Sequence, residues 1–402
     1  MWRRYLVLAV VILVGIAGGL GWHFWGGTSE AALPPWTDDM QAVAEANNRF
    51  ALDMYAQLRE EKGNLFFSPY SIHTALSMTA VGARGTTRDQ MLKLLHLPDE
   101  KKLLAAGDLG RFYSARRKGY ELSVANAIWG RKGFGWNADF VAIQNERFGT
   151  GFQEADFAGN PDGERKRINR WVEDKTHDRI KELLLPGQIT GGTTMVLANA
   201  IYFKGKWATE FTPSKTREAD FHLDDGSRVR VQMMHTNAKC GIAGGNFDGV
   251  WGVELPYRGD ELSMVVLLPQ KHGQTLSEFE QQLTPLKLAD YLNHLKDRGE
   301  YEVSLPRFEF ESRFEVLETL GKLGLTDASD FSGMGADPGA LAHVSHKAFV
   351  KVNEEGTEAA AATAAGMVTS GPPSFYANRP FLFLIRDVKR GTILFMGRFE
   401  RP

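Results

Sequence analysis

The chain has 402 residues, of which 43% are hydrophobic and 24% charged, and its formal net charge at pH 7 is -2. This balance is ordinary for a soluble globular protein and excludes a disordered or collagen-like chain, and no basic block interleaved with aromatic residues indicates nucleic-acid binding. Cys240 is the only cysteine, so the sequence excludes an intrachain disulfide and a thiolate metal cluster. The length exceeds the roughly 250 to 300 residues that one core usually supports, which predicts two domains or one unusually large sheet-based domain.

The N-terminal segment differs from the rest of the chain. Arg3 and Arg4 precede an apolar run over residues 5–25. A helix of this length, at about 1.5 Å per residue, can cross a bilayer of about 30 Å. The leading arginines favour a cytoplasmic N-terminus and an exported body. No small-x-small cleavage site follows directly, which favours an uncleaved anchor over a cleaved signal peptide, although both interpretations stay open.

These features predict three parts. Residues 1–25 are a signal anchor or signal peptide, residues 26–36 are a linker rich in small residues and proline, and residues 37–402 form one folded domain. The body would be membrane-anchored through residues 5–25, facing the periplasm or the exterior, or secreted if the segment is cleaved.

The first third of the body is predicted to be helical. Apolar residues recur near the 3.6-residue period over 40–58, and Gly63 follows as a stop signal. A second helix is expected within 68–85, with Ser71 as its N-cap. Thr87 and Gln90 have the spacing of a capping box for a third helix.

Strands dominate the remainder. Residues 193–203 form a continuous β-prone run, as expected for a strand that is covered on both faces. Residues 262–269 form another, residues 344–353 alternate strictly, and residues 380–397 read as a terminal hairpin around a charged turn. The pattern therefore predicts an α+β fold.

No stretch indicates catalysis or metal binding. The sequence has no nucleophile elbow, metalloprotease helix motif or phosphate-binding loop. The glycines of 333–339 have the wrong spacing for a dinucleotide fingerprint, and we expect a loop there. His343 and His346 would face opposite ways on the alternating strand and cannot share an ion. We therefore expect no enzyme, no metal and no cofactor, and a structural thiol at Cys240.

Two segments near the C-terminus carry a family resemblance. "EEGTEAAAATAA" (354–365) resembles the reactive-loop hinge of the serpins, and "FYANRPFLFLI" (375–385) resembles their C-terminal signature. Further blocks follow the family's order: "NLFFSPYSI" (64–72), "LANAIYFKGKW" (197–207), "ELPYRGDELSMVVLLP" (254–269), "DFSGM" (330–334) and "HKAFVKVNEEGTEAA" (346–360). The resemblance covers residues 36–402 and implies the serpin fold, with a helix-rich N-terminal part, large mixed sheets and an exposed reactive loop over about 354–375.

The resemblance also implies a mechanism. A serpin offers its reactive loop as a substrate and inserts the cleaved loop as a new strand of the main sheet, while the protease is still held as an acyl-enzyme. The implied partner is a serine protease, bound covalently by a monomeric inhibitor without a cofactor. Some family members do not inhibit proteases, and a binding or carrier scaffold is the alternative function.

The hinge composition suits such an insertion. Alternation places Thr357, Ala359, Ala361 and Thr363 on the inward face, where only small side chains can enter a packed sheet. Glu358 falls on the outer face, where its carboxylate can stay hydrated, and no proline occurs between residues 354 and 371. An alanine run alone is also typical of a surface helix or tether. The predicted hinge comprises Glu354, Glu355, Gly356, Thr357, Glu358, Ala359, Ala360, Ala361, Ala362 and Thr363.

Other positions carry over from the family by resemblance. Ser68, Ser71, Asn199 and His346 match the polar cluster beneath the sheet centre, called the shutter. Trp207 matches the tryptophan at the top of the sheet, called the breach, where insertion begins. Glu354 fits the hinge carboxylate that pairs with a nearby basic side chain.

The predicted scissile bond is Thr369–Ser370. The loop is one residue shorter than the commonest length, so Ser370–Gly371 is the next choice and Met367–Val368 the third. The leading choices present a small uncharged side chain to the protease. This favours an elastase-like or subtilisin-like target over trypsin-like enzymes, which require arginine or lysine.

Overall fold

The computed structural model describes residues 34–115, 117, 119–149, 151–243, 249–270, 274–295, 298–336, 339–341, 343–357 and 374–402. The chain divides into two units, residues 1–35 and 36–402, and the elements that follow belong to the second. The predicted membrane segment, residues 5–25, lies outside the described ranges. Within those ranges, none of the helices combines the length and apolar character that crossing a bilayer requires.

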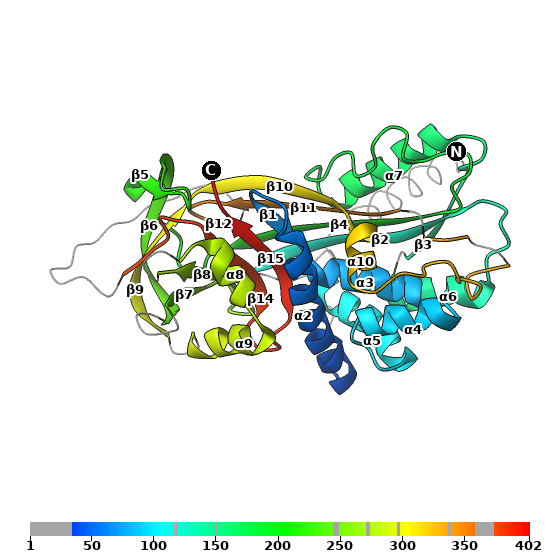
Figure 1. The fold of residues 1–402 in the computed structure, drawn as a ribbon, viewed down its shortest axis with the longest axis horizontal. Helices are drawn as coiled ribbons and strands as arrows, with labels where there is room; N and C mark the ends of the chain where they lie inside the picture. The colour runs from blue at the N-terminus through cyan, green and yellow to red at the C-terminus, as the bar shows by residue number, and fades with distance from the viewer. Residues whose placement is uncertain are drawn as a thin grey trace, which may run out of the picture. The chain divides into compact units, whose positions relative to one another are not determined.

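Helices gather in the first third of the second unit, as predicted (Figure 1). The long helix expected over residues 40–58 is confirmed as α2, and its apolar stripe is buried. The helices of the described chain are α2 (Asp38–Leu58), α3 (Pro69–Ala80), α4 (Gly85–Leu94), α5 (Glu100–Ser114), α6 (Ala138–Phe148), α7 (Pro161–Lys175), α8 (Leu276–Gln282), α9 (Pro285–His294) and α10 (Val316–Lys322), with a 3-10 turn at Pro213–Lys215.

Two predicted caps are wrong. Ser68, not Ser71, caps α3, because the helix starts at Pro69 and the Ser68 hydroxyl accepts the Ser71 amide at 3.0 Å. Thr87 and Gln90 form no capping box, since α4 begins at Gly85. Their side chains instead hold the loop that follows α10: Thr87 Oγ1 accepts the Asp330 amide at 3.0 Å, and the Gln90 carboxamide donates to Thr326.

A six-stranded sheet runs through the long dimension of Figure 1. Its order is β10 (Phe308–Glu315), β11 (Val344–Val352), β12 (Gly356–Thr357), β4 (Met195–Lys206), β2 (Tyr120–Arg131) and β3 (Phe152–Ala155). Beyond the short β12, strands β11 and β4 pair directly in parallel, with Val344 opposite Leu197 and Phe349 opposite Tyr202. The strand predicted over 193–203 is therefore β4. Both of its faces are covered, because Ile201 joins the main core and Ala200 a second cluster with α7.

The other described strands form a nine-stranded sheet. Its order is β1 (Leu65–Phe67), β15 (Ile393–Phe399), β14 (Phe381–Asp387), β8 (Leu262–Pro269), β7 (Val250–Pro256), β6 (Arg228–Ala243), β9 (Arg298–Pro306) and β13 (Ser374–Tyr376), with β5 (Arg217–His222) paired to β6. The predicted strand over 262–269 and the terminal hairpin are confirmed as β8 and as β14 with β15. Cys240 is buried in β6.

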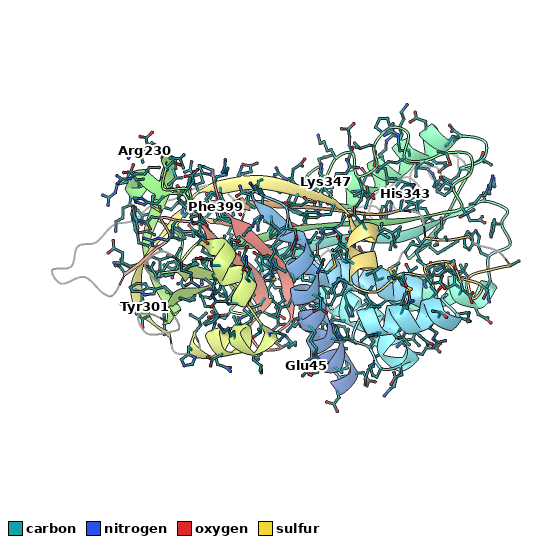
Figure 2. The ribbon with its side chains drawn as sticks, viewed as in Figure 1. Glu45, Arg230, Tyr301, His343, Lys347 and Phe399 are labelled. Carbon is teal, nitrogen blue, oxygen red and sulfur yellow. The ribbon has the colours of Figure 1, made fainter. Side chains whose placement is uncertain are left out.

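Aromatic side chains fill the core between the two sheets. Phe399 of β15 stacks on Phe308 of β10 at a centroid separation of 4.8 Å and lies inside the packed body, whereas Arg230 and Glu45 lie at its surface (Figure 2). The α+β prediction is confirmed by this mixture of helices and two mixed sheets.

Candidate functional site

The first residues of the predicted hinge form the short strand β12, which lies between β11 and β4. Thr357 pairs with Val352 on one side and with Gly205 on the other, and Gly356 pairs with Lys206. A Cβ atom on Gly356 would lie 2.0 Å from the Gly205 carbonyl oxygen, so only glycine fits at this point. The hinge is thus already two residues into the sheet.

Thr357 points into the core. Its side chain is buried, and its hydroxyl shares a hydrogen bond of 2.8 Å with the hydroxyl of Tyr257. Tyr257 is also fully buried, and burial raises the pKa of its phenol far above the usual range, so the phenol is neutral. Tyr257 lies within the family-like block 254–269, but no sequence motif predicts its contact with Thr357.

The rest of the predicted loop lies outside the described residues. This applies to the remaining hinge positions, Glu358 to Thr363, and to the candidate scissile bonds at Thr369, Ser370 and Gly371. The structure resumes at β13, where Ser374 pairs with Glu302 of β9 in the nine-stranded sheet. The loop therefore leaves one sheet at Thr357 and joins the other at Ser374.

Glu354 is anchored at the end of β11. The Arg307 guanidinium donates to its carboxylate at 2.5 Å, and the Thr216 hydroxyl donates at 2.6 Å. Burial alone would raise the pKa of this carboxyl, but the two hydrogen bonds outweigh burial and lower it. The carboxylate therefore stays charged and connects the start of the hinge to Arg307, the residue immediately before β10.

Trp207 lies beside the inserted residues. Its ring stacks on Tyr257 at 4.7 Å with planes 9° apart, and its indole N–H donates to the Asn353 carbonyl at 3.0 Å. Its backbone amide donates to the Glu355 carbonyl at 2.8 Å. Trp207 thus contacts both the turn before β12 and the aromatic ring that holds Thr357.

The four predicted shutter residues meet beneath the centre of the six-stranded sheet. The Asn199 carboxamide donates to Ser71 Oγ at 2.8 Å, and Ser68 Oγ caps the helix that carries Ser71. Sequence reasoning missed Asn126 of β2, which accepts from Asn199 at 2.5 Å and from Ser71 Oγ at 3.1 Å. Asn126 comes from a strand for which no motif was recognised, so only the fold reveals it.

His346 connects β11 to this cluster. Burial lowers its pKa to about 3, so the ring is neutral at physiological pH. Because Nε2 accepts the Ser68 amide at 3.2 Å, Nδ1 carries the proton and donates to Asn199 Oδ1. Nothing in the described part of the chain forms a cluster of His, Cys, Asp or Glu side chains that could hold a metal ion.

The geometry defines what this site can do chemically. Two long strands, β4 and β11, are paired along one half and separated by β12 at the other. A strand that continues from Thr357 would have to break the β4–β11 pairing and the His346–Asn199 hydrogen bond. In exchange it would pair with a strand on each side. The gap that β12 opens between β4 and β11 is therefore the point at which a further strand could pair with both.

Comparisons with known proteins agree with this architecture. A family model described as Serpin (serine protease inhibitor) matches residues 45–402. The human leukocyte elastase inhibitor is 38% identical over 382 residues, which cover 90% of this chain and 100% of that protein. Among solved structures, uncleaved ovalbumin matches with a TM-score of 0.81 and 26% identity over 90% of this chain and 100% of that one. Human thyroxine-binding globulin with its ligand matches with a TM-score of 0.82 and 28% identity over 90% and 99%.

Proposed function

The chain belongs to the serpin family, and on this premise we propose that it inhibits serine proteases as a suicide substrate. The protease would cleave the Thr369–Ser370 bond in the loop that follows β12, and the severed hinge would then insert between β4 and β11 and trap the acyl-enzyme. The observation that carries the proposal is β12, whose two residues occupy the entrance to that position. The chain would act as a monomer without a cofactor and would not be an enzyme.

The register of β12 supports the inward assignment of the hinge. Continued along β4 and β11, it would put Ala359 and Ala361 on the same face as Thr357, toward the main core. The adjacent β4 residues on that face, Phe203 and Ile201, are large and buried, which leaves room only for small incoming side chains.

The same register would bring Thr363 to the shutter. Thr357 pairs with Gly205 and Val352, and six residues further each partner strand reaches Asn199 and His346. A threonine hydroxyl there could donate and accept hydrogen bonds. It would replace the partner that His346 and Asn199 lose when the strands part.

The proposed target is an elastase-like or subtilisin-like serine protease. It would cleave the loop at Thr369–Ser370, with Ser370–Gly371 as the second choice. Small uncharged residues precede both bonds. The name of the human relative, leukocyte elastase inhibitor, supports the same class of target. Mass spectrometry of the released C-terminal peptide tests this assignment, since the expected peptide begins at Ser370.

Incubation with pancreatic elastase tests the inhibitory mechanism. We expect a covalent complex that survives SDS. Thr357→Arg should convert the protein into a substrate that is cleaved without complex, because a charged side chain cannot follow the inward path. The matched control, Thr357→Ser, keeps a small hydroxyl side chain and should still form the complex. Undiminished trapping by Thr357→Arg would contradict the inward assignment.

The alternative function is a binding or carrier scaffold that does not inhibit. The likeness to thyroxine-binding globulin, which was solved in complex with thyroxine, is the observation that favours it. Clean cleavage of the wild-type chain by several elastase-like and subtilisin-like proteases, with no complex, would support the carrier.

We propose further that the body is exported and tethered, or secreted. The support comes from the sequence alone, namely Arg3 and Arg4 followed by the apolar run over 5–25. Fractionation of cells that express the full chain, followed by N-terminal sequencing, distinguishes the anchor from the cleaved signal peptide. Recovery of an intact chain in the cytoplasmic fraction would refute both.

A further inference from the structure

A pocket of about 690 Å³ lies beside the hinge. Three segments line it: the link between α5 and β2, the neighbouring ends of β2 and β4, and the turn between β7 and β8. Its volume falls within the roughly 300 to 1,000 Å³ that is usual for small-molecule sites. The lining is mainly polar and includes Arg117, Glu121, Lys204, Lys206 and Arg258.

The charges in this pocket are unevenly compensated. Glu121 is the acidic residue in the lining, and it is already paired with His177 at 2.5 Å. The Arg258 side chain is 54% exposed and forms an ion pair of 2.7 Å with Glu210, which is not part of the lining. Within the described chain, Lys204 has neither an ion pair nor a side-chain hydrogen bond. Positive charge therefore exceeds negative charge.

Lys206 is only weakly paired. Its side chain is 41% exposed, and its ammonium lies 3.8 Å from a carboxylate oxygen of Glu355, which is the edge of ion-pair contact. Both carboxylate oxygens of Glu355 are buried and accept no hydrogen bond from the described residues. Neither group is well satisfied by the other, since buried carboxylates usually accept several hydrogen bonds.

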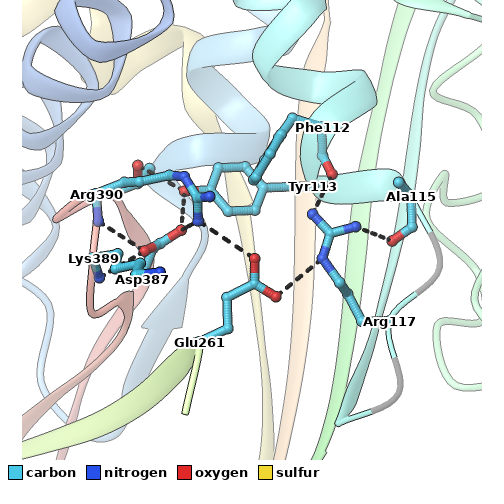
Figure 3. Close-up of polar contacts among 9 residues, drawn as sticks. Phe112, Tyr113, Ala115, Arg117, Glu261, Asp387, Lys389 and Arg390 are labelled. Atoms are coloured by element: carbon cyan, nitrogen blue, oxygen red, sulfur yellow. Dashed lines mark hydrogen bonds and ion pairs between the residues drawn. The ribbon is translucent and has the colours of Figure 1, made fainter. Parts of the chain in front are cut away.

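The walls of the pocket are held in place. The Arg117 side chain is 7% exposed and donates to Glu261 at 3.0 Å and to the carbonyls of Ala115 and Phe112 (Figure 3). A Cβ atom on Gly119 would lie 1.7 Å from the Arg258 carbonyl oxygen, so Gly119 lies directly against the β7–β8 turn. The cationic groups are therefore presented by a preformed frame, which lowers the entropic cost of binding.

We propose that this pocket binds a compact ligand that carries two or more phosphate groups. Lys204 and Lys206 extend from the same face of β4, and Arg258 extends from the turn opposite. An arginine can contact a phosphate through two parallel N–H groups, and lysines act as compact point charges. Three cations in a pocket of this volume suit more than one phosphate. The site does not depend on the proposed inhibitory function.

Glu355 makes the proposal specific. Its carboxylate is the negative charge nearest to Lys206, so it competes with an anion for that lysine. Removal of this charge in Glu355→Gln should therefore strengthen binding. A site formed by diffuse surface charge would respond weakly to a single buried residue.

Isothermal titration calorimetry with inorganic tripolyphosphate, on the full chain at fixed ionic strength, tests the site. We expect saturable one-to-one binding that Lys204→Gln weakens at least about tenfold and Glu355→Gln strengthens. Lys93→Gln, at an exposed lysine in the last turn of α4, is the matched control and should bind like wild type. Arg258→Gln provides a second variant should Lys204→Gln fold poorly, which thermal unfolding without ligand reveals.

Two outcomes would overturn the proposal: no saturable heat with the wild-type chain, or equal losses in Lys204→Gln and Lys93→Gln. Because no protease is present in the assay, these outcomes are separate from any failure to trap elastase.

Discussion

Replacement of Gly356 by alanine should drive β12 out of its position between β4 and β11. The new Cβ would lie 2.0 Å from the Gly205 carbonyl oxygen and 2.7 Å from the Lys206 Cα. Both contacts are with backbone atoms of β4. Because β4 is packed between two clusters of buried side chains, its displacement would disrupt both clusters and cost free energy. The hinge has to leave instead.

The expected loss of stability follows from the bonds that β12 makes. Departure would break the Tyr257–Thr357 hydrogen bond, the bond from the Asn353 amide to the Gly356 carbonyl, and the ladder bonds to β4. At about 1 kcal/mol net for each of three or four such bonds, unfolding should become easier by about 3 kcal/mol. The same contact would obstruct insertion after cleavage, so Gly356→Ala should also behave as a substrate.

Urea unfolding and the stoichiometry of elastase inhibition measure the two effects. Gly321→Ala is the matched control, because nothing lies within 4 Å of its added Cβ and it lies in the last turn of α10. That variant should keep the wild-type stability to within about 1 kcal/mol and inhibit normally. The reasoning is refuted if Gly356→Ala unfolds at the wild-type urea concentration.

Three further predictions address the stability gained on loop insertion, the buried histidines and the hydrogen bond between Tyr257 and Thr357. Cleavage of the loop should raise the melting temperature by roughly 10 °C or more, because a twelve-residue inserted strand would contribute about 10 kcal/mol. Scanning calorimetry of cleaved and uncleaved protein measures this difference. Equal melting temperatures would show that insertion of the cleaved loop releases no free energy. Burial lowers the pKa values of His346 and His73 to about 3 and about 4, whereas both are near 6.5 when unfolded, so the unfolded state binds the extra protons. The free energy of unfolding should therefore be highest above pH 6.5 and fall by up to about 1.4 kcal/mol per histidine for each pH unit below 6.5. Urea unfolding at pH 7, 6 and 5 measures this loss, and a free energy of unfolding that does not change with pH would contradict it. Tyr257→Phe should destabilise the uncleaved protein by about 1 to 2 kcal/mol, because it leaves the Thr357 hydroxyl buried without its partner; an unchanged urea midpoint would show that this hydrogen bond contributes nothing.

Elements with a clear hydrophobic period could be predicted from the sequence. The stripe of α2, the continuous apolar run of β4 and the alternation of β11 each depend on burial against a neighbouring layer, and burial leaves a local pattern in the residues. The helix caps were less predictable. Ser68 and Ser71 are both good caps, and the position of Pro69 selected the first.

The partners of the hinge left no local pattern. Arg307 and Thr216 hold Glu354, and Tyr257 holds Thr357, across separations of 47, 138 and 100 residues. Asn126 joins the shutter from a strand that sequence reasoning did not single out. Such contacts depend on strand register, which periodicity alone does not fix between distant strands.

The position of the terminal hairpin has a consequence for how the protein is made. Strands β14 and β15 lie inside the nine-stranded sheet, between β8 and β1, and every residue in them is buried. A ribosome releases these residues after all the other described strands of the sheet, so the edges of β8 and β1 stay unpaired until β14 and β15 emerge. Completion of the core must therefore wait for these two strands, and a nascent chain that still lacks them should depend on chaperones to avoid aggregation.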